Sequence, residues 1–266
     1  MVRTEVARGT QVQHWAKRRM NHLFAADGKA VMVAMDHSRM GGTRGLENVR
    51  QAVANMVAGG VDSIMTTIGM AKEIGDVLGN AGLIIALDSE GPIADYGADQ
   101  ALRFGADAVE LKVFPGNPTE TKLADLRRLA ARCDEIGMPL LAEPIPVSFQ
   151  DAAAHTVENV AKGARIGAEA GADFVKVHYV GPVEEYRKVT AECYVPVLIL
   201  GGTPKEDARE ALQMAADAVA AGARGVVYGR NVILHPRPDR MVAALAEIVH
   251  GGANVDQAAK ELNPPR

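Results

Sequence analysis

A lysine inside an apolar segment is the residue of this sequence with the clearest chemical potential. Lys176 lies in Gly171-Ala-Asp-Phe-Val-Lys-Val-His-Tyr179, where β-forming residues surround it and Gly181-Pro182 ends the segment. An ammonium is costly to bury unless it is paired or neutralised. Burial lowers the pKa of a lysine from about 10.4, and a neutral amine attacks carbonyl carbons. The segment therefore predicts a lysine that forms a Schiff base; the plainer alternative is a lysine at a strand end whose ammonium reaches water.

Groups that could carry protons stand at or near the ends of other apolar segments. Asp36-His37 end the first of them, Glu143 lies in the fifth, and His178 follows Lys176 by two residues. Residues two apart share one face of a strand, so Lys176 and His178 point the same way. Carboxylates and imidazoles are the usual general acids and bases. A hydrogen-bonded barrel residue without a catalytic role is the alternative for His178.

A third pair, Glu110 and Lys112, also shares one strand face and could form either an internal ion pair or part of a site. Metal binding is a further use of the polar residues. The sequence has no HxH, HxxxH or CxxC spacing, which leaves metal binding weakly indicated and no cofactor expected. The residues that it would use are His37, Asp88, Glu90 and His178.

The elements that must position these residues follow a pattern that occurs four times. An alanine-rich helix ends at a glycine, one or two small or polar residues follow, and an apolar segment begins. The glycine can adopt the left-handed conformation that closes a helix, and an apolar segment buried on both faces is typical of a parallel sheet. The pattern occurs at Gly60-Val-Asp62, Gly105-Ala-Asp107, Gly171-Ala-Asp173 and Gly222-Ala-Arg224.

Strands and helices alternate along the chain, which indicates βαβ units. The predicted strands are Ala30–His37, Ser63–Gly69, Gly82–Asp88, Ala108–Phe114, Pro139–Pro146, Phe174–Val180, Pro196–Gly201 and Gly225–Gly229. The clearest predicted helices are Glu47–Ala58, Thr119–Ile136, Glu158–Ala170, Lys205–Ala221 and Asp239–His250, and the weakest crossover is Gly91–Leu102.

This alternation predicts an α/β fold, a single (β/α)8 TIM barrel over about residues 30–252, with residues 1–266 forming one domain. An extra N-terminal helix is expected over Gln11–Ala25, and a C-terminal helix over Asn254–Leu262. An open doubly wound sheet is the alternative, and the even spacing of the strands favours the barrel.

The composition agrees with one large domain and narrows the class of protein. Hydrophobic residues make up 48% of the 266 residues, and the formal net charge is −4 without a basic run. We therefore expect no nucleic-acid partner and no membrane partner. Cys133 and Cys193 have no metal-ligand spacing, and Met1–Met20 lacks the apolar core of a secretory signal. These features predict a cytoplasmic protein.

Two glycine-rich strand ends predict an anion site. The active sites of TIM barrels lie at the carboxyl ends of the strands, and phosphate commonly binds at the loops after strands seven and eight. In this chain Gly201-Gly202 and Gly229-Arg230 occupy these two positions. Glycine lets the backbone approach an anion closely, and arginine adds a forked cation.

With these residues in place, the chain resembles the class I aldolases of the archaeal fructose-bisphosphate aldolase type, also called the DhnA type, in the DeoC/LacD superfamily. The resemblance runs from about Val31 to Gly252. It rests on Ala34-Met-Asp-His37, on the segment around Lys176, on Pro196-Val-Leu-Ile-Leu-Gly-Gly202 and on Gly229-Arg-Asn231. Relatives include aminodideoxyheptulosonate synthases and the autoinducer-2 phosphate thiolase.

The resemblance implies roles for individual residues. Lys176 matches the Schiff-base lysine and Asp36 the aspartate that assists proton transfers, while Gly201, Gly202, Gly229 and Arg230 match the phosphate site. It also implies a ring-type homo-oligomer.

One position departs from the family pattern. Archaeal members carry a catalytic tyrosine where this chain has Ile145, followed by Pro146. Isoleucine cannot carry a proton, so we hypothesise that Glu143, two residues earlier on the same strand face, replaces the tyrosine, as in tagatose-bisphosphate-type relatives. His37 and His178 are further candidate proton carriers.

The sequence thus predicts a metal-independent aldehyde-lyase that binds a phosphorylated ketone resembling dihydroxyacetone phosphate and makes or breaks a C–C bond. The alternatives are a thiolase-like acyl transferase that uses coenzyme A, a heptulosonate synthase-type transaldolase and a metal-dependent lyase. A catalytically silent barrel that serves as a binding or assembly protein is the non-enzyme alternative.

Overall fold

The chain folds into a closed parallel barrel whose strands follow the order of the sequence, β1 to β8. The computed structural model describes residues 16–36, 44–87, 93–119 and 121–263. The predicted TIM-barrel class is thereby confirmed, and the open-sheet alternative is wrong. The strands are β1 (Ala30–Ala34), β2 (Ser63–Thr66), β3 (Gly82–Leu87), β4 (Ala108–Val113), β5 (Leu140–Pro144), β6 (Phe174–Val177), β7 (Val197–Leu200) and β8 (Gly225–Tyr228).

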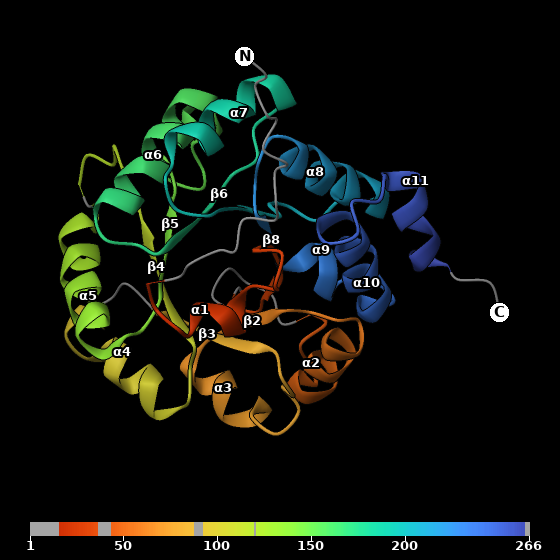
Figure 1. The fold of residues 1–266 in the computed structure, drawn as a ribbon, viewed down its shortest axis with the longest axis horizontal. Helices are drawn as coiled ribbons and strands as arrows, with labels where there is room; N and C mark the ends of the chain where they lie inside the picture. Colours follow the sequence, from red (N-terminus) through yellow and green to blue (C-terminus); the bar gives the residue numbers. More distant parts are fainter. Residues whose placement is uncertain (1–15, 37–43, 88–92, 120, 264–266) are drawn as a thin grey trace, which may run out of the picture.

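Helices cover the outside of the barrel and connect successive strands (Figure 1). They are α2 (Val49–Ala58), α3 (Ile68–Ile74), α4 (Ile93–Arg103), α5 (Leu123–Ile136), α6 (Val157–Glu169), α7 (Val183–Glu192) and α8 (Ala208–Ala220). Two further helices, α9 (Arg230–Ile233) and α10 (Pro238–Val249), follow β8. A 3-10 turn, η2 (Ala152–Ala154), precedes α6. The C-terminal helix forms as predicted, as α11 (Val255–Ala258) and the 3-10 turn η3 (Ala259–Leu262). None of the helices described is long and apolar enough to cross a membrane.

The predicted strands begin where the observed strands do, within one residue, and in the described part of the chain all but the third run one to three residues too far. The chain leaves the sheet early because local capping competes with strand pairing. At the end of β2, for example, the Thr67 hydroxyl accepts a hydrogen bond from the Met70 N–H and starts α3. Such capping is a strong local preference that apolar patterning does not reveal.

The repeated glycine–aspartate pattern proves to close the floor of the barrel. The four helix-ending glycines all have positive φ, between 73° and 107°. The aspartate that follows accepts a hydrogen bond from a main-chain N–H near the start of the preceding strand: Asp62 from Val31 (2.7 Å), Asp107 from Leu83 (3.0 Å) and Asp173 from Leu140 (2.8 Å). Each aspartate thus links two neighbouring βα units. A cationic or imidazole group balances each carboxylate: His250, His22 and Lys17.

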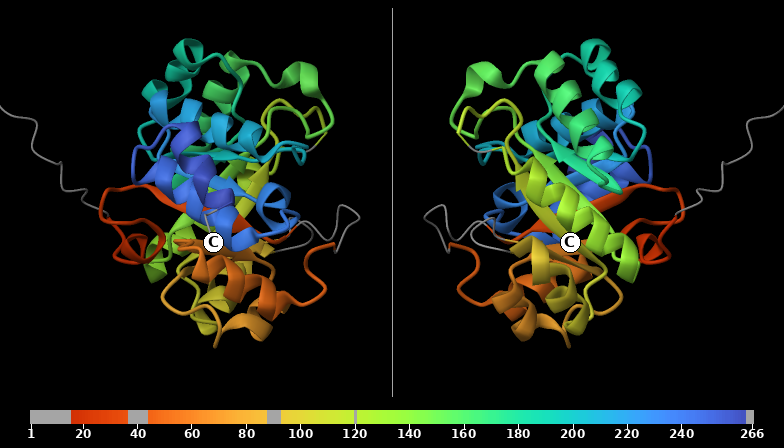
Figure 2. Two further views of the ribbon diagram at one scale, coloured as in Figure 1. Left: turned by 90° about the vertical axis from the view of Figure 1, so that its right-hand side faces the viewer. Right: turned by 90° about the vertical axis from the view of Figure 1, so that its left-hand side faces the viewer.

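The N-terminal segment seals the same end of the barrel. Met20, Leu23 and Phe24 are buried with the residues that fill the lumen, and the Phe24 ring meets the Phe174 ring edge to face at 5.4 Å. Figure 1 shows α1 (Met20–Leu23) across the middle of the ring of strands, and Figure 2 shows this segment, in red, at one end of the barrel.

The predicted helix over Gln11–Ala25 is therefore too long, because residues 16–19 form bends and turns in the described part of the chain. Tertiary contacts decide this conformation: Lys17 pairs with Asp173 across 156 residues, and Arg19 reaches the main-chain oxygen of Gly137.

Two layers of side chains form the core. Residues such as Val33, Ile85 and Val175 pack outward against the helices, while their neighbours Ala34, Ala86 and Phe174 fill the lumen. This alternation places the even-numbered positions of β4 and β6, and the odd-numbered positions of β5, inside the barrel.

Candidate active site

The lumen face of three neighbouring strands carries charged residues at adjacent positions. The register of β4 and β5 pairs Lys112 with Glu143, and the register of β5 and β6 pairs Ala142 with Val175, one residue before Glu143 and Lys176. Three charged side chains therefore lie side by side toward the carboxyl ends of the strands. In a TIM barrel this end of the strands is where catalytic groups gather.

Lys176 and Glu143 form a pair that is nearly sealed from solvent. The Nζ atom of Lys176 lies 2.9 Å from Oε1 of Glu143, and the side chains are 7% and 2% exposed. The second carboxylate oxygen of Glu143 is buried and accepts no hydrogen bond from the described residues. A buried carboxylate with a free oxygen beside an amine is suited to proton exchange with that amine and with a bound substrate.

Lys112 lies at the centre of a charge network with Asp36, Glu110 and Glu143. The sequence suggested only its pairing with Glu110. Its Nζ atom donates to Asp36 at 2.7 Å and to Glu110 at 3.4 Å, and it lies 3.7 Å from Glu143. The sequence signal for this role was weak, because Asp36 and Lys112 are 76 residues apart and meet only across the closed barrel.

The network perturbs the protonation of its members. Burial alone raises the pKa of Asp36, but the charges of Lys112 and Lys176 outweigh it and hold that pKa below its ordinary value. Burial lowers the pKa of Lys112, yet the surrounding carboxylates raise it well above the usual range. Asp36 is therefore a carboxylate and Lys112 an ammonium at neutral pH.

Glu110 differs from the other carboxyl groups because it lies deepest. Its side chain is fully buried, and burial, followed by the neighbouring carboxylates, raises its pKa to about 8 against the opposing effect of Lys112. At neutral pH Glu110 is mainly a neutral acid, and its Oε1 atom has no hydrogen-bond partner among the described residues.

His178 follows Lys176 by two residues but lies just beyond the end of β6, and its Nδ1 atom has no hydrogen-bond partner among the described residues. Its ring stacks on the ring of His155 with centroids 4.0 Å apart, and the Phe149 ring approaches its edge at 6.0 Å. Burial, His155 and Lys176 lower the pKa of His178 to about 4, against Glu143, which raises it. His178 is thus a neutral imidazole at physiological pH. The other histidine singled out from the sequence, His37, lies outside the described residues.

The glycine-rich ends of β7 and β8 lie together at the rim of the barrel. Gly202 has a φ of +64° with open space where a Cβ would stand, and the guanidinium of Arg230 approaches its carbonyl oxygen at 3.4 Å. A Cβ on Gly229 would stand 2.9 Å from the main-chain oxygen of Ala34, and one on Gly201 3.0 Å from Asn231. The two loops are therefore packed too closely for side chains, with open space above Gly202.

Asn231 joins these two loops, a role that the sequence did not reveal. Its amide Nδ2 donates to the carbonyl of Gly201 at 2.7 Å, and its Oδ1 accepts from the N–H of Lys205 at 2.8 Å. Asn231 is buried at the start of α9. Its two hydrogen bonds hold the β7 loop against the β8 loop.

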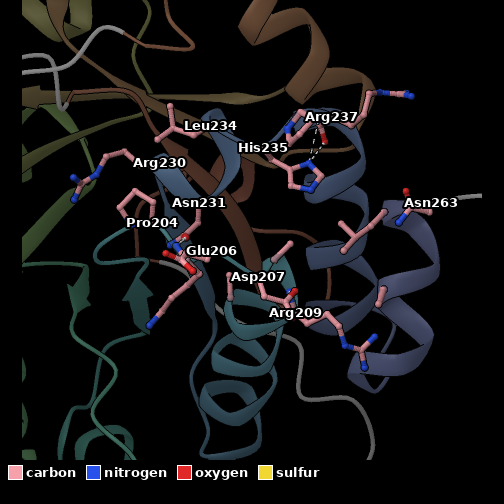
Figure 3. A pocket seen from close by; sticks show the side chains of 16 residues that line it. Pro204, Glu206, Asp207, Arg209, Arg230, Asn231, Leu234, His235, Arg237 and Asn263 are labelled. Carbon is pink, nitrogen blue, oxygen red and sulfur yellow. Dashed lines mark hydrogen bonds between the residues drawn. The ribbon is translucent and has the colours of Figure 1, made fainter.

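A cavity of about 620 Å³ lies on the outer side of these loops, between them and η3. In Figure 3 Arg230 extends away from His235 and Asn263, which line the opposite part of the cavity. Neither Lys176 nor Glu143 borders it, whereas Arg230 and Asn231 of the β8 loop do. No group of three or more metal-ligating side chains is found among the residues that the structure describes.

A closed barrel with a buried amine and carboxylates at the carboxyl ends of its strands has the design of an enzyme that acts on carbonyl compounds. Comparison with known proteins specifies the family. A sequence profile described as DeoC/LacD family aldolase matches residues 24–235. The chain belongs to this family and is a class I aldolase, an enzyme that works through a lysine Schiff base.

Curated relatives of similar length carry related names. A 2-amino-3,7-dideoxy-D-threo-hept-6-ulosonate synthase of Halobacterium salinarum is 33% identical over 90% of this chain and 93% of its own. A protein of the same name from Archaeoglobus fulgidus is 35% identical over 91% of this chain and 93% of its own.

Solved structures agree on the fold. An archaeal fructose 1,6-bisphosphate aldolase superposes with a TM-score of 0.78 at 25% identity, covering 88% of this chain and 98% of that one. Another such aldolase, whose catalytic lysine carries the carbinolamine intermediate of its substrate, superposes with a TM-score of 0.75 at 26% identity, covering 87% of this chain and 98% of that one.

Proposed function

We propose that this enzyme reversibly cleaves a C–C bond in a phosphorylated ketose through a Schiff base on Lys176. Glu143 and Asp36 carry the protons, and the loops after β7 and β8 hold the phosphate. The observation that supports this assignment best is the 2.9 Å contact between Lys176 Nζ and Glu143 Oε1 in the nearly sealed lumen. The isoleucine at position 145 is fully buried and offers no proton, so Glu143 takes the place of the family's tyrosine.

The first half of the reaction forms the iminium. Glu143 accepts a proton from Lys176, and the neutral amine attacks the ketone carbon. As the C–N bond forms, the π electrons of the carbonyl move to its oxygen, which takes a proton from the attacking nitrogen to give a neutral carbinolamine. Glu143 returns the proton to the carbinolamine hydroxyl, which leaves as water and gives the iminium. The amine and the acid must alternate as donor and acceptor, which a direct hydrogen bond between them allows.

In the second half the C–C bond breaks. A base removes the proton from the hydroxyl on the β carbon, the bond between the α and β carbons breaks, and its electron pair moves to the iminium nitrogen. The products are an aldehyde and an enamine, which takes a proton on carbon before water hydrolyses it. Asp36, held ionised by Lys112, is the second proton carrier.

The phosphate anchor uses the rim of β7 and β8. Main-chain N–H groups around Gly202 and Gly229, with the guanidinium of Arg230, supply the donors that an anion requires. Since β7 is the direct neighbour of β6, a ketone phosphate bound there reaches Lys176 with its carbonyl.

Borohydride reduction with dihydroxyacetone phosphate tests this function. We expect a stable adduct of one substrate molecule, found by intact mass and peptide mapping on Lys176, and none in Lys176→Met. The matched control is Lys162→Met, on the exposed face of α6, which should keep the adduct. Absence of an adduct with dihydroxyacetone phosphate and with other phosphorylated ketones would refute the Schiff-base assignment.

A transaldolase of the heptulosonate synthase type is a second candidate, because the two curated relatives at 33% and 35% identity carry that name. The borohydride adduct is common to both candidates. Without borohydride, transfer of the enzyme-bound ketone fragment to an added aldehyde, measured against release of free ketone, distinguishes them. From the resemblance we also expect a cytoplasmic homo-oligomer of the ring type, which light scattering on the purified protein would test.

A further inference from the structure

The loops on the two sides of Lys176 differ in the groups that they offer to a phosphate. On one side, the loops after β7 and β8 carry Lys205 and Arg230, together with the carboxylates Glu206 and Asp207. On the other side, the loops that follow β4, β5 and β6, residues 114–122, 145–156 and 178–182, contain no arginine, one lysine, Lys122, and two carboxylates, Glu120 and Asp151. A guanidinium, which suits a phosphate, therefore stands beside β7 and β8 and is absent from the loops that follow β4, β5 and β6.

Aromatic rings lie on this second side. Phe114 meets Phe149 edge to face at 6.4 Å, Phe149 meets His178 at 6.0 Å, and His178 stacks on His155 at 4.0 Å and an interplanar angle of 26°. The rings come from the ends of β4, the β5–α6 segment and the end of β6, so they form one wall along three neighbouring strands. His155 is held in this wall by a 2.8 Å contact between its Nε2 atom and the carbonyl of Ser148.

The wall contains one polar atom that nothing satisfies. Nδ1 of His178 is buried and has no hydrogen-bond partner in the described part of the chain. A buried polar atom without a partner is costly, and a ligand that supplies one gains affinity. Because the low pKa of His178 keeps the ring neutral at physiological pH, it offers a hydrogen bond but no charge. An uncharged hydroxyl satisfies such a group; a phosphate does not, because it requires cations or several N–H donors.

We propose that the wall of Phe149, His155 and His178 binds the aldehyde half of the substrate, and that this half is an uncharged hydroxyaldehyde whose hydroxyl bonds Nδ1 of His178. The substrate class is accordingly a ketose phosphorylated at one end, in contrast to a ketose bisphosphate. This inference rests on the proposed function, since it presumes that the ketone half is anchored at the β7 and β8 loops and bound to Lys176.

The condensation reaction measures the preference directly. With dihydroxyacetone phosphate as the constant donor, kcat/KM is compared for glyceraldehyde and for glyceraldehyde 3-phosphate. We expect glyceraldehyde to react at least tenfold faster. A 3-phosphate that reacts equally well or better, or a failure of glyceraldehyde to react, would overturn the inference.

The role of His178 is tested by the ratio of two kcat/KM values measured on the same variant. This ratio does not depend on the fraction of the protein that is folded. The kcat/KM for glyceraldehyde is divided by that for propanal, which has no hydroxyl. We expect His178→Phe, which keeps an aromatic ring but removes Nδ1, to lower this ratio about tenfold, the effect of one buried hydrogen bond. An unchanged ratio would contradict the bond. His235→Phe, a histidine on the outer cavity, is the matched control and should keep the wild-type ratio.

Borohydride trapping with dihydroxyacetone phosphate alone separates the two levels of the argument, because no aldehyde takes part. Absence of trapping in the wild-type enzyme, with dihydroxyacetone phosphate and with the other phosphorylated ketones, refutes the proposed function. Trapping on Lys176 without a preference for the uncharged aldehyde refutes only the assignment of the aromatic wall.

Discussion

Glu143 on β5 and Lys176 on the neighbouring strand β6 are joined by a 2.9 Å contact between Oε1 and Nζ. The other oxygen of the same carboxylate, Oε2, lies 3.7 Å from Nζ of Lys112 on β4. Glu143 thus has one oxygen on the reacting amine and the other facing a permanent positive charge. This arrangement leaves one oxygen of Glu143 available for substrate.

Replacing Glu143 by Gln should separate binding from catalysis. The amide keeps the shape of the side chain but cannot take a proton, so we expect turnover to fall by a factor of about 10² to 10⁴. Borohydride trapping of dihydroxyacetone phosphate on Lys176 should still occur, given longer incubation. Steady-state kinetics and intact mass measure the two effects, and unchanged turnover would rule out Glu143 as the proton carrier.

Replacing Lys112 by Met should destabilise the fold and disturb the site together. The substitution leaves Asp36 and Glu143 buried without their shared cation, and removing one partner of a buried ionic network typically costs about 3–5 kcal/mol. Urea unfolding at pH 7 measures the loss. The surface substitution Lys162→Met should stay within about 0.5 kcal/mol of the wild type. Equal stability of the two variants would show that Lys112 is not the centre of the network.

Glu110 should make the stability of the protein depend on pH. Its folded-state pKa of about 8 lies above the ordinary value of 4.5. The stability that its protonated form contributes is therefore fully present below about pH 4.5 and is lost as the pH rises through about 8. In Glu110→Gln this loss should be absent. The difference in unfolding free energy between variant and wild type should thus grow in favour of the variant from pH 5 to pH 8.5. A difference that does not change with pH would contradict the raised pKa.

Asn231 should control affinity for the phosphorylated ketone without touching the reacting atoms. Replacing it by Ala removes the two hydrogen bonds that hold the β7 loop against α9. We expect KM for the ketone phosphate to rise about tenfold while kcat changes little, because each buried hydrogen bond contributes roughly 1 kcal/mol. Asn263→Ala, in the outer cavity, is the control and should leave KM unchanged. A fall in kcat with constant KM would argue against a positioning role.

The closure of the barrel between β8 and β1 should depend on a single glycine. A Cβ on Gly225 would stand 1.9 Å from the main-chain oxygen of Ala30, whereas one on Gly60, which also has positive φ, would meet nothing within 4 Å. Gly60→Ala should therefore lose only the roughly 1–2 kcal/mol of a left-handed residue. Gly225→Ala should fail to give soluble protein or lose clearly more stability. Thermal unfolding of the two variants makes the comparison, and similar melting temperatures would contradict it.

The local pattern of the sequence was sufficient for the architecture. Alternating helical and apolar segments, each closed by a glycine such as Gly60 or Gly171, repeat often enough to specify a barrel, because strand burial on both faces and helix termination are local properties. The starts of the strands followed from the same pattern. The resemblance to class I aldolases added the reaction class, and the match of residues 24–235 to the family bears this out.

The tertiary structure decided what depends on contacts between distant residues. The N-terminal segment forms turns and one short helix because of contacts with the floor of the barrel. Lys17 pairs with Asp173, 156 residues further along the chain, and Phe24 packs on Phe174, 150 residues further along.

The same reason explains the additions to the site. Lys112 meets Asp36, Asn231 meets Gly201, and His155 stacks on His178 only after the barrel has closed. Spacing along the chain records the face on which a side chain lies, but the distances and pKa values of the site arise from the register of neighbouring strands and from the exclusion of water by the folded lumen.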